Sequence, residues 1–288
     1  MAHSLPIITL LTDFGDQDGY AGVMKGVILT IAPHVRLVDI SHQIKPQDIQ
    51  QAAHILGSAY RYFPPHTIHL VVVDPGVGGQ RRAIALETPR GRFVAPDNGV
   101  LTDVLLQEPS WQAVMLDKPD YWLPNPSYTF HGRDIFSPVA AHLANGVPLH
   151  RLGSPVDELI LLEQPPLEVL PNAIRGQVVR IDRFGNALTN IMRLRWIDER
   201  TVEFQPLNPS LIPTGTLRFD ARKARVTFGW HTLNGLHQTY SQVPVGQPTA
   251  LIGSTDGLEI AVNQGNAADA LAIKVRDTVA LLFEPTGA

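Results

Sequence analysis

The fold is indicated by residues 6–41, PIITLLTDFGDQDGYAGVMKGVILTIAPHVRLVDIS. Residues 6–12 are a continuous apolar run, which is typical of a buried strand, and residues 35–41 have the same character. Between them, residues 19–33 carry apolar side chains at helical spacing. A strand, a helix and a second strand in this order predict a βαβ unit at the start of the chain.

The same alternation continues through the first half of the chain. Residues 47–63 repeat the helical period, and residues 67–74, TIHLVVVD, are an apolar run of the kind that is buried on both faces of a sheet. Two further helical patterns occupy residues 98–107 and 133–146. We therefore predict an α/β N-terminal domain over residues 1–164.

The second half has a different pattern. Pro165, Pro166 and Pro171 prevent a helix and favour an extended connector between domains. After the connector, short strand-like runs separated by turns extend over residues 173–263. This spacing predicts an all-β, barrel-like C-terminal domain over residues 172–288.

Composition excludes several classes of protein. With 44% hydrophobic and 17% charged residues, the chain has the balance of a soluble globular protein. The net charge of −4 gives no footprint for nucleic acid, so we expect no nucleic-acid partner. The absence of cysteine excludes disulfides, thiolate catalysis and cysteine-ligated zinc. Because we find no signal peptide and no apolar run of about 18 residues, we expect no membrane partner and a cytoplasmic location.

The sharpest local motif is residues 71–87, VVVDPGVGGQRRAIALE. An apolar strand ends at Asp74, the chain turns through glycines, and Arg81 precedes a second apolar strand. Active sites of α/β proteins often lie at such strand ends. The glycines also fit a phosphate-binding loop, but that loop needs a following helix N-terminus, whereas residues 83–87 are strand-like. An aspartate beside Pro-Gly can equally hydrogen-bond within its own turn.

A second motif, residues 129–142, TFHGRDIFSPVAAH, places His131 in a turn before a helix. A histidine at a polar turn is a candidate for proton transfer near neutral pH, although a merely solvated histidine has the same sequence signature. Asp134 is most simply an N-terminal helix cap. Because His131, Asp134 and His142 match no compact metal-ligand motif, we expect no metal site.

Three aspartates, Asp13, Asp16 and Asp18, surround the turn after the first strand. Carboxylates in this place suit a ribose diol or a divalent cation. Capping of the following helix by Asp16 or Asp18 is the structural alternative. The acidic residue that should close a calcium loop is missing, which argues against calcium.

The second domain contains a further motif, residues 179–191, VRIDRFGNALTNI. Asp182 offers a carboxylate for a cation, and Phe184 offers a ring for stacking. The amides of Asn186 and Asn190 are able to read the edge of a base. A β-turn around Phe184 explains the glycine and asparagine that follow it equally well.

A fifth segment, residues 253–265, GSTDGLEIAVNQG, places Ser254 and Glu259 around a turn and a strand. The five segments occur together, in order, over almost the whole chain. In the elements TDFG…DGY, VDPGVG…R, FHGRD, IDxFGN and GS…LEIAVN, they resemble the S-adenosylmethionine hydrolase family. These hydrolases are the water-using relatives of the fluorinase and chlorinase enzymes.

The resemblance implies an α/β N-terminal domain joined to a β-barrel-like C-terminal domain, in agreement with the patterns above. It also implies a homotrimer, with each site between the N-terminal domain of one subunit and the C-terminal domain of the next. The implied reaction is hydrolysis of S-adenosyl-L-methionine to adenosine and L-methionine, by in-line attack of an activated water or hydroxide on the ribose 5′ carbon. S-adenosyl-L-methionine is then the small-molecule substrate, and no cofactor is expected.

The catalytic Asp-Arg-His set of the family corresponds by motif to Asp74, Arg81 and His131, with Arg82 as the neighbouring alternative to Arg81. Which of Asp74 and His131 is the base stays open. The substrate-binding residues that the resemblance implies are Asp13 for the ribose hydroxyls, Phe184 and Asn186 for adenine, Asp182 and Ser254 for the amino-acid end of methionine, and Glu259.

The sequence departs from the fluorinase pattern where the halide would bind. The fluorinase has a tyrosine at the position of Asp74, and at the position of His131 a tyrosine followed by a halide-contacting serine; here Gly132 replaces that serine. Three alternatives remain. A halogenase of the same fold would form a 5′-halo-adenosine, and a sensor would bind its adenosyl ligand unchanged. A metal-dependent hydrolase built on Asp13, Asp18 and His131 would lose activity with a chelator.

Overall fold

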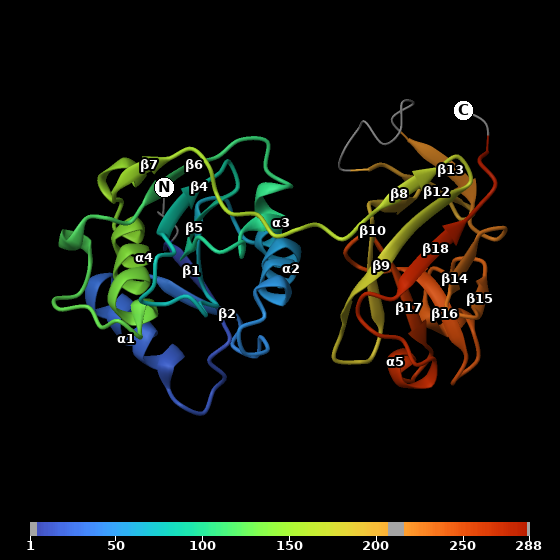
Figure 1. The fold of residues 1–288 in the computed structure, drawn as a ribbon, viewed down its shortest axis with the longest axis horizontal. Coiled ribbons are helices and arrows are strands. Elements are labelled where there is room, and N and C mark those ends of the chain that lie inside the picture. Colours follow the sequence, from blue (N-terminus) through green and yellow to red (C-terminus); the bar gives the residue numbers. More distant parts are fainter. Residues whose placement is uncertain (1–4, 207–215, 287–288) are drawn as a thin grey trace. The chain divides into compact units, whose positions relative to one another are not determined.

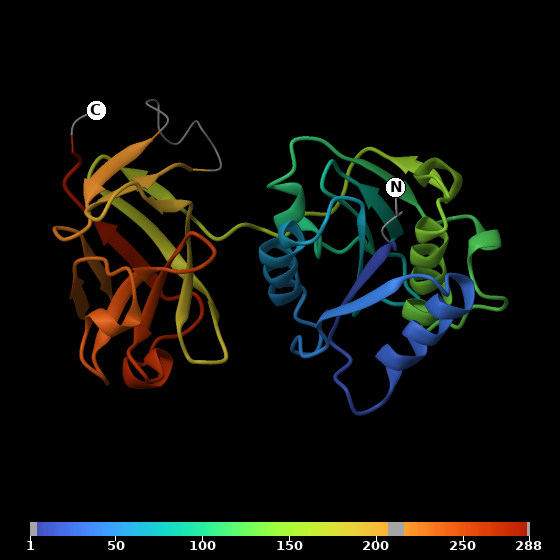
Figure 2. The ribbon, with the colours of Figure 1, turned by 180° about the vertical axis from the view of Figure 1, so that it is seen from behind.

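The chain folds into two units, Met1–Leu162 and Glu163–Ala288 (Figure 1; Figure 2). The computed structural model describes residues 5–206 and 216–286. The outermost residues of the predicted domains, 1–164 and 172–288, and an internal segment of the second domain therefore lie outside the described residues.

The first unit is built on a seven-stranded sheet with the order β2-β1-β3-β5-β4-β6-β7. The neighbours of β1, and the pair β3 and β5, are parallel, whereas β4 is antiparallel to β5 and β6, and β6 is antiparallel to β7. The predicted βαβ unit therefore opens a mixed sheet. The strands are β1 (Ile7–Thr12), β2 (Arg36–Ser41), β3 (Thr67–Val72), β4 (Ala83–Glu87), β5 (Gly91–Pro96), β6 (Gln112–Met115) and β7 (Ser154–Val156).

Helices cover both faces of this sheet, as Figure 1 and Figure 2 show. Helices α1 and α4 pack on one face, and α2 and α3 pack on the other. The predicted α/β fold of this half is thus confirmed. The helices are α1 (Tyr20–Ile31), α2 (Ile49–Ala59), α3 (Thr102–Leu105) and α4 (Ser137–Ala144), with 3₁₀ turns at Tyr60–Tyr62, Pro119–Tyr121 and Leu149–Arg151 and a π-helical turn at Gly132–Phe136.

The alternation of side chains along the central strands explains the two layers. Ile8 and Leu10 of β1 join the core under α1 and α4, whereas Leu11 points to the opposite core under α2. The register pairs Thr12, the last residue of β1, with Val72, the last residue of β3. The two loops that follow β1 and β3 therefore leave the sheet side by side at its carboxyl edge, where α/β proteins place their ligands.

The second unit is all-β and barrel-like, as predicted. An eight-stranded antiparallel sheet follows the order β15-β14-β18-β9-β10-β17-β16, with β8 beside β9, and a bridge between His237 and Leu251 links its two ends. A three-stranded sheet, β11-β12-β13, packs against the same core. The strands are β8 (Glu168–Leu170), β9 (Ala173–Ile181), β10 (Ala187–Met192), β11 (Leu194–Trp196), β12 (Thr201–Phe204), β13 (Leu217–Asp220), β14 (Arg225–Phe228), β15 (His231–Asn234), β16 (Pro248–Ile252), β17 (Gly257–Val262) and β18 (Thr278–Leu282), with helix α5 at Ala267–Ala270 and a 3₁₀ turn at Tyr240–Gln242.

Part of the predicted connector is a strand. Residues 165–171 lie in the second unit, and within them β8 pairs with the start of β9 through Glu168 and Arg175. The prolines exclude a helix here but leave room for a short edge strand. Among residues 5–206 and 216–286, no helix combines the length and the apolar character needed to cross a bilayer.

One buried histidine gives the first unit a pH-dependent stability. His69 of β3 is fully buried, its Nδ1 lies 2.8 Å from the Thr9 hydroxyl, and its ring stacks on Phe93 at 5.0 Å. Its Nε2 has no hydrogen-bond partner among the described residues. Burial lowers the pKa of His69 from 6.5 to about 3, because the charged ring would be stranded in the core.

We predict that the free energy of unfolding falls as the pH drops from 6.5 towards 3. In this range His69 is protonated in the unfolded chain but stays neutral in the folded protein. This difference lowers the free energy of unfolding by about 2 kcal/mol between pH 7 and pH 5. Urea unfolding of the native protein and of His69→Leu at pH 7 and pH 5 measures the contribution of His69 to this pH dependence. The variant should lose stability at pH 7 but show the smaller pH dependence; equal pH dependence in both proteins would contradict the assignment.

Candidate active site

Arg81 joins the other two predicted catalytic side chains. Its Nε donates to both carboxylate oxygens of Asp74, at 2.9 and 3.0 Å, and its Nη2 donates to Asp74 Oδ2 at 2.5 Å. The same Nη2 lies 2.7 Å from Nδ1 of His131. Arg82, the alternative arginine, instead pairs with Asp97 at 2.7 Å. The structure therefore brings together Asp74, Arg81 and His131, and directs Arg82 elsewhere.

The Asp74–Arg81 pair is largely removed from solvent. Its side chains are 5% and 10% exposed, respectively. The Arg81 guanidinium also lies over the Phe136 ring, 5.3 Å from its centre. Burying two charges costs solvation free energy, which good geometry and further hydrogen bonds must offset. Three donor contacts and the aromatic face supply that compensation, so the pair is held in one orientation.

The contact with Arg81 determines the protonation of His131. Because a guanidinium only donates hydrogen bonds, Nδ1 of His131 must accept, and the neutral ring carries its proton on Nε2. Burial lowers the pKa of His131, and the charge of Arg81 lowers it further, while Asp74 and Asp134 oppose the change. At neutral pH, His131 is thus an uncharged ring that presents an N–H group.

The loop after β3 is fixed against the segment before His131 by a close backbone approach. Gly78 has a φ of 74°, and a Cβ atom at this position would overlap the carbonyl oxygen of Tyr128. His131 then leads directly into a π-helical turn, a distortion that often occurs at functional sites. Only glycine permits this packing of the two segments.

Asp134 does not cap a helix, and that prediction is wrong. Its carboxylate accepts from the backbone N–H of Ser127 at 2.8 Å and pairs with Arg133 at 2.6 Å. These contacts lower the pKa of Asp134 despite its burial, which alone would raise it. Asp134 therefore ties down the loop that leads to His131.

Asp13 lies in the loop after β1, where its Oδ2 accepts from the backbone N–H of Gln47 at 2.8 Å. The neighbouring Phe14 packs edge-on against Phe130, with ring centres 5.8 Å apart, which links this loop to the one that carries His131. Neither Asp16 nor Asp18 caps helix α1, because Gly19 precedes the helix without any side-chain cap.

In the second unit, Asp182 organises its own turn. Its Oδ1 accepts from the backbone N–H groups of Phe184 and Asn186, at 2.8 and 2.9 Å, and its Oδ2 accepts from the Asn186 side chain at 3.1 Å. Phe184 is left 76% exposed, whereas Asn186 is buried. Asn190, the other candidate amide, instead donates to the carbonyl oxygens of Pro165 and Pro166.

Glu259 is a buried carboxyl group close to the same turn. It accepts from the Tyr240 hydroxyl at 2.7 Å, and burial raises its pKa, with Asp182 adding to the effect. Ser254 is exposed in the turn between β16 and β17, directly after Gly253. The predicted substrate-binding residues of this unit thus lie on its β9–β10 turn and on the β16–β17 hairpin. Sequence analysis missed Tyr240, because a partner 19 residues away leaves no local signal.

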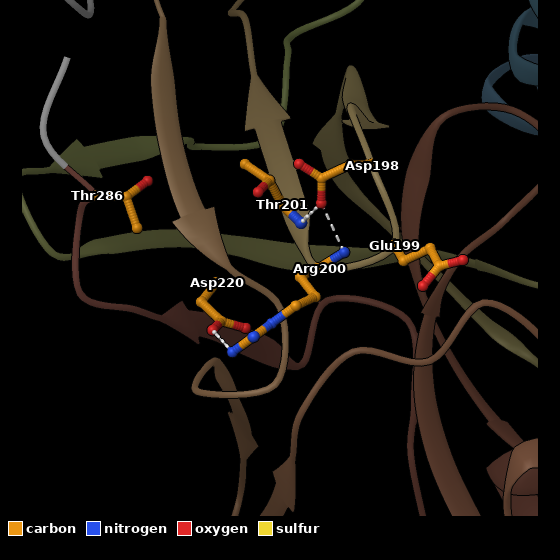
Figure 3. Close-up of a pocket in the computed structure, with 6 residues that line it drawn as sticks. All are labelled: Asp198, Glu199, Arg200, Thr201, Asp220 and Thr286. Atoms are coloured by element: carbon orange, nitrogen blue, oxygen red, sulfur yellow. Dashed lines mark hydrogen bonds and ion pairs between the residues drawn. The ribbon is translucent and has the colours of Figure 1, made fainter.

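One hollow in the second unit is formed by other residues. A hollow of about 580 Å³ is lined by Asp198, Arg200, Asp220 and their neighbours, as Figure 3 shows. Its Arg200 pairs with Asp220, and Asp198 accepts from backbone N–H groups, so these side chains stabilise turns. Within the described ranges, no three histidine, aspartate or glutamate side chains cluster in a way that would hold a metal ion.

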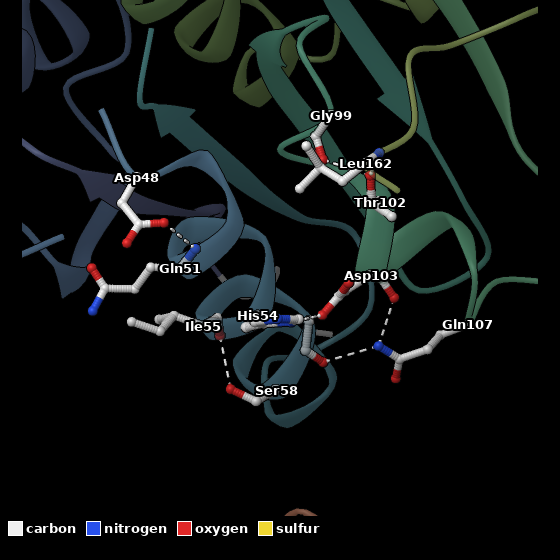
Figure 4. Close-up of polar contacts among 11 residues, drawn as sticks. Asp48, Gln51, His54, Ile55, Ser58, Gly99, Thr102, Asp103, Gln107 and Leu162 are labelled. Carbon is white, nitrogen blue, oxygen red and sulfur yellow. Dashed lines mark hydrogen bonds and ion pairs between the residues drawn. The ribbon is translucent and has the colours of Figure 1, made fainter. Parts of the chain in front are cut away.

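Another histidine–aspartate pair lies between α2 and α3 (Figure 4). His54 Nδ1 is 2.5 Å from Asp103 Oδ2, and both side chains are about four-fifths buried. The Gln107 side chain donates to the carbonyl oxygens of Gly57 and Asp103 beside this pair. The arrangement joins two helices through polar contacts, and none of the predicted site residues takes part in it.

Comparisons with known proteins place this geometry in a family. Models of the N-terminal and C-terminal domains of the SAM hydroxide adenosyltransferase family match residues 8–153 and 176–280. The (R)-S-adenosyl-L-methionine hydrolase of Thermus thermophilus is 38% identical, over 96% of this chain and 99% of its own length. The enzyme of the same name from Salinispora arenicola is 35% identical, over 95% and 97%. A fluorinase of an Actinoplanes species is 29% identical, over 76% and 82%.

Solved structures are similar over the same extent. The crystal structure of an uncharacterized conserved protein from Thermotoga maritima has a TM-score of 0.82 and 36% identity, covering 96% of this chain and 99% of its own. That of a conserved hypothetical protein from Thermus thermophilus has a TM-score of 0.74 and 35% identity, covering 96% and 100%.

We predict that Gly78→Ala lowers activity more than the backbone strain of a positive φ alone would explain. The new Cβ must displace the loop around Asp74 from Tyr128, which should destabilise the protein by about 1–3 kcal/mol and lower kcat/KM by about tenfold or more. The matched control is Gly146→Ala, where φ is 86° but no atom lies within 4 Å of the added Cβ. Thermal unfolding and turnover of both variants test this; equal activity losses would refute it.

Proposed function

Because the chain belongs to the SAM hydroxide adenosyltransferase family, we propose that it hydrolyses S-adenosyl-L-methionine to adenosine and L-methionine. The observation that carries this proposal is the buried Arg81, which holds Asp74 and His131 together beside the carboxyl ends of β1 and β3. That arrangement provides an anionic acceptor and a neutral N–H donor, which together are able to orient one water molecule.

The proposed chemistry is a single in-line displacement. The sulfonium of the substrate is a permanent cation, so its departure from the ribose 5′ carbon leaves a neutral thioether and needs no acid. A lone pair of the water oxygen forms the new bond to C5′ while the pair of the C5′–S bond moves to sulfur. The water loses one proton, which makes adenosine, methionine and a proton the balanced products.

We assign the proton to Asp74 rather than to His131. The Nδ1 lone pair of His131 is already used by Arg81, and its Nε2 carries hydrogen, so the neutral ring has no free lone pair for a proton. Asp74 Oδ1 accepts only one of the three contacts from Arg81 and keeps a free lone-pair direction. In this scheme His131 orients the water oxygen by donating from Nε2, and Arg81 stabilises the developing hydroxide.

The substrate contacts follow the same division. We propose that Asp13 binds the ribose hydroxyls, since a carboxylate is able to accept hydrogen bonds from two hydroxyl groups. The exposed ring of Phe184 supports stacking on adenine. The proposed set is completed by Asn186 for adenine, Asp182 and Ser254 for the amino-acid end of methionine, and Glu259 beside Asp182.

We also propose a homotrimer in which the second unit of one subunit completes the site on the first unit of another. Exposed apolar side chains on α1 and β2, among them Tyr20, Val23 and Val38, support an interface there, and the particle mass in solution tests it. We propose a cytoplasmic location, with which the absence of disulfide-forming cysteines is compatible. We propose that the reaction needs no cofactor. The domain limits 1–164 and 172–288 stay a prediction from the sequence.

A halogenase reaction is disfavoured by the packing at Gly132. A Cβ atom there would lie 3.3 Å from both Met24 Sδ and Val72 Cγ1 and 3.2 Å from the Phe130 ring. A serine side chain, which could bind halide, would therefore require its neighbours to move.

The first experiment incubates metal-free, halide-depleted protein with S-adenosyl-L-methionine and separates the products by chromatography. We expect adenosine and methionine in equal amounts, and a loss of about 10²–10⁴-fold in Asp74→Asn. The relatives are named for the (R) form, so both epimers at sulfur are supplied. Intact bound ligand would support a sensor instead. A 5′-halo-adenosine formed on adding chloride or fluoride would support a halogenase, and a chelator-sensitive activity would support a metal-dependent hydrolase.

A second prediction tests whether His131 orients the water as a hydrogen-bond donor or acts as the base. Glutamine retains an amide donor near the position of Nε2, whereas leucine does not, so His131→Gln should keep at least about tenfold more activity than His131→Leu. If His131 were the base, both variants would lose activity to the same extent. Because the pKa of His131 is lowered from 6.5, native kcat/KM should fall on the acid side as the ring gains a proton, with a midpoint below pH 6.5.

A further inference from the structure

A second buried histidine, His42, lies beneath the loop that carries Asp13. Its side chain is 5% exposed, and its Nδ1 is 2.8 Å from the hydroxyl of Thr12. That hydroxyl oxygen also accepts from the backbone N–H of Phe14 at 3.3 Å. The backbone carbonyl of His42 accepts from the N–H of Gly15 at 2.8 Å. His42 therefore contacts the loop on both sides of Asp13, once through its ring and once through its backbone.

The far side of the ring faces a charge. Nε2 of His42 lies 3.1 Å from Asp39 Oδ1, and Asp39 Oδ2 accepts from Lys25 at 2.6 Å. Burial raises the pKa of Asp39, but the contacts with Lys25 and His42 outweigh it and keep the group ionised. The Nε2 group does not point straight at the carboxylate, so this contact is electrostatic rather than a well-aligned hydrogen bond.

These contacts specify the direction of each donor. In the tautomer that places its proton on Nε2, facing the negative Asp39, His42 accepts at Nδ1. Thr12 then donates its hydroxyl proton to His42, and its oxygen is free to accept from Phe14. The peptide between Asp13 and Phe14 is thereby fixed by a chain of partners that begins at Lys25.

The residues after His42 continue the contact with the same loop. Gln47 donates its backbone N–H to the Asp13 carboxylate at 2.8 Å, and the Gln43 side chain donates to Asp16 at 2.5 Å. The Asp13 loop is thus held at its peptide, at its carboxylate and at its far end by residues 42–47. A carboxylate placed to meet two hydroxyls at once needs this kind of support, because a displacement of about 1 Å weakens both contacts.

We infer that His42 is a positioning residue, which holds Asp13 in the orientation that meets the two ribose hydroxyls. This inference rests on the proposed role of Asp13 in ribose binding. His42 itself touches neither the substrate nor the reacting atoms in this scheme. Its loss should therefore weaken the recognition of the ribose hydroxyls specifically, rather than the chemical step.

The test compares adenosine with 2′,3′-dideoxyadenosine as inhibitors of hydrolysis. The inhibition constant of 2′,3′-dideoxyadenosine divided by that of adenosine reports what the two hydroxyls contribute to binding. We expect His42→Leu to lower this ratio about fivefold to tenfold, the effect of a weakened hydrogen bond, and Asp13→Asn to lower it at least as much. His42→Asn retains a polar atom near the position of Nδ1 and should restore most of the ratio. The double variant Asp13→Asn/His42→Leu should show no further loss.

The chain offers a matched control in His69. It is also buried and also contacts a threonine of β1 at 2.8 Å, but that threonine is Thr9, which lies within the strand rather than at its end. His69→Leu should lower stability and leave the ratio unchanged. Thr12→Val interrupts the same chain of contacts without altering His42, and it gives the answer if His42→Leu does not fold.

The outcomes separate the two proposals. If Asp13→Asn leaves the ratio at its native value, Asp13 does not bind the ribose hydroxyls, and both the proposed role and the inference fall. If Asp13→Asn lowers the ratio but His42→Leu and Thr12→Val behave like His69→Leu, the inference about His42 alone is overturned. A loss of ratio in both His42→Leu and Thr12→Val, with rescue by His42→Asn, supports it.

Discussion

The parallel pairing of β1 with β3 is the constraint on which the rest of the first unit depends. Since Thr12 and Val72 end their strands in register, the two loops that follow must leave the sheet next to one another. After β1 the chain turns into α1 on one face of the sheet, whereas after β3 it turns back into β4 of the same sheet. Asp13 and Asp74 are thus brought to one edge by backbone hydrogen bonding, before any side chain makes a specific contact.

Arg81 orients the other two side chains of the candidate active site. A buried guanidinium cannot lose its proton, so every neighbour must adapt to it. Asp74 accepts three contacts from Arg81, and His131 accepts at Nδ1, which leaves an N–H group at Nε2. The hydrogen-bond directions of the site are therefore set by one permanently charged group.

Much of the fold was predictable because it depends on local pattern. Periodicity identified α1, α2 and the central strands, and the change of pattern after the prolines identified the all-β unit. The antiparallel half of the first sheet was not predicted, since pairing partners leave no local signal. The same limit applies to side chains. Adjacent arginines such as Arg81 and Arg82 differ only in the direction in which they point, and Asp134 resembles a cap until its contact with Ser127 is seen.

Two threonine–histidine pairs along β1 illustrate how position gives identical groups different roles. Thr9 meets His69 in the middle of the sheet, where the second ring nitrogen is surrounded by aromatic side chains and the ring is kept neutral. Thr12 meets His42 at the end of the strand, where the second nitrogen faces Asp39. The first pair lies within the regular pairing of β1 and β3, so we expect it to affect stability alone. The second lies where the strand becomes a loop, so in the proposed scheme the same 2.8 Å contact sets the direction of the Asp13 carboxylate.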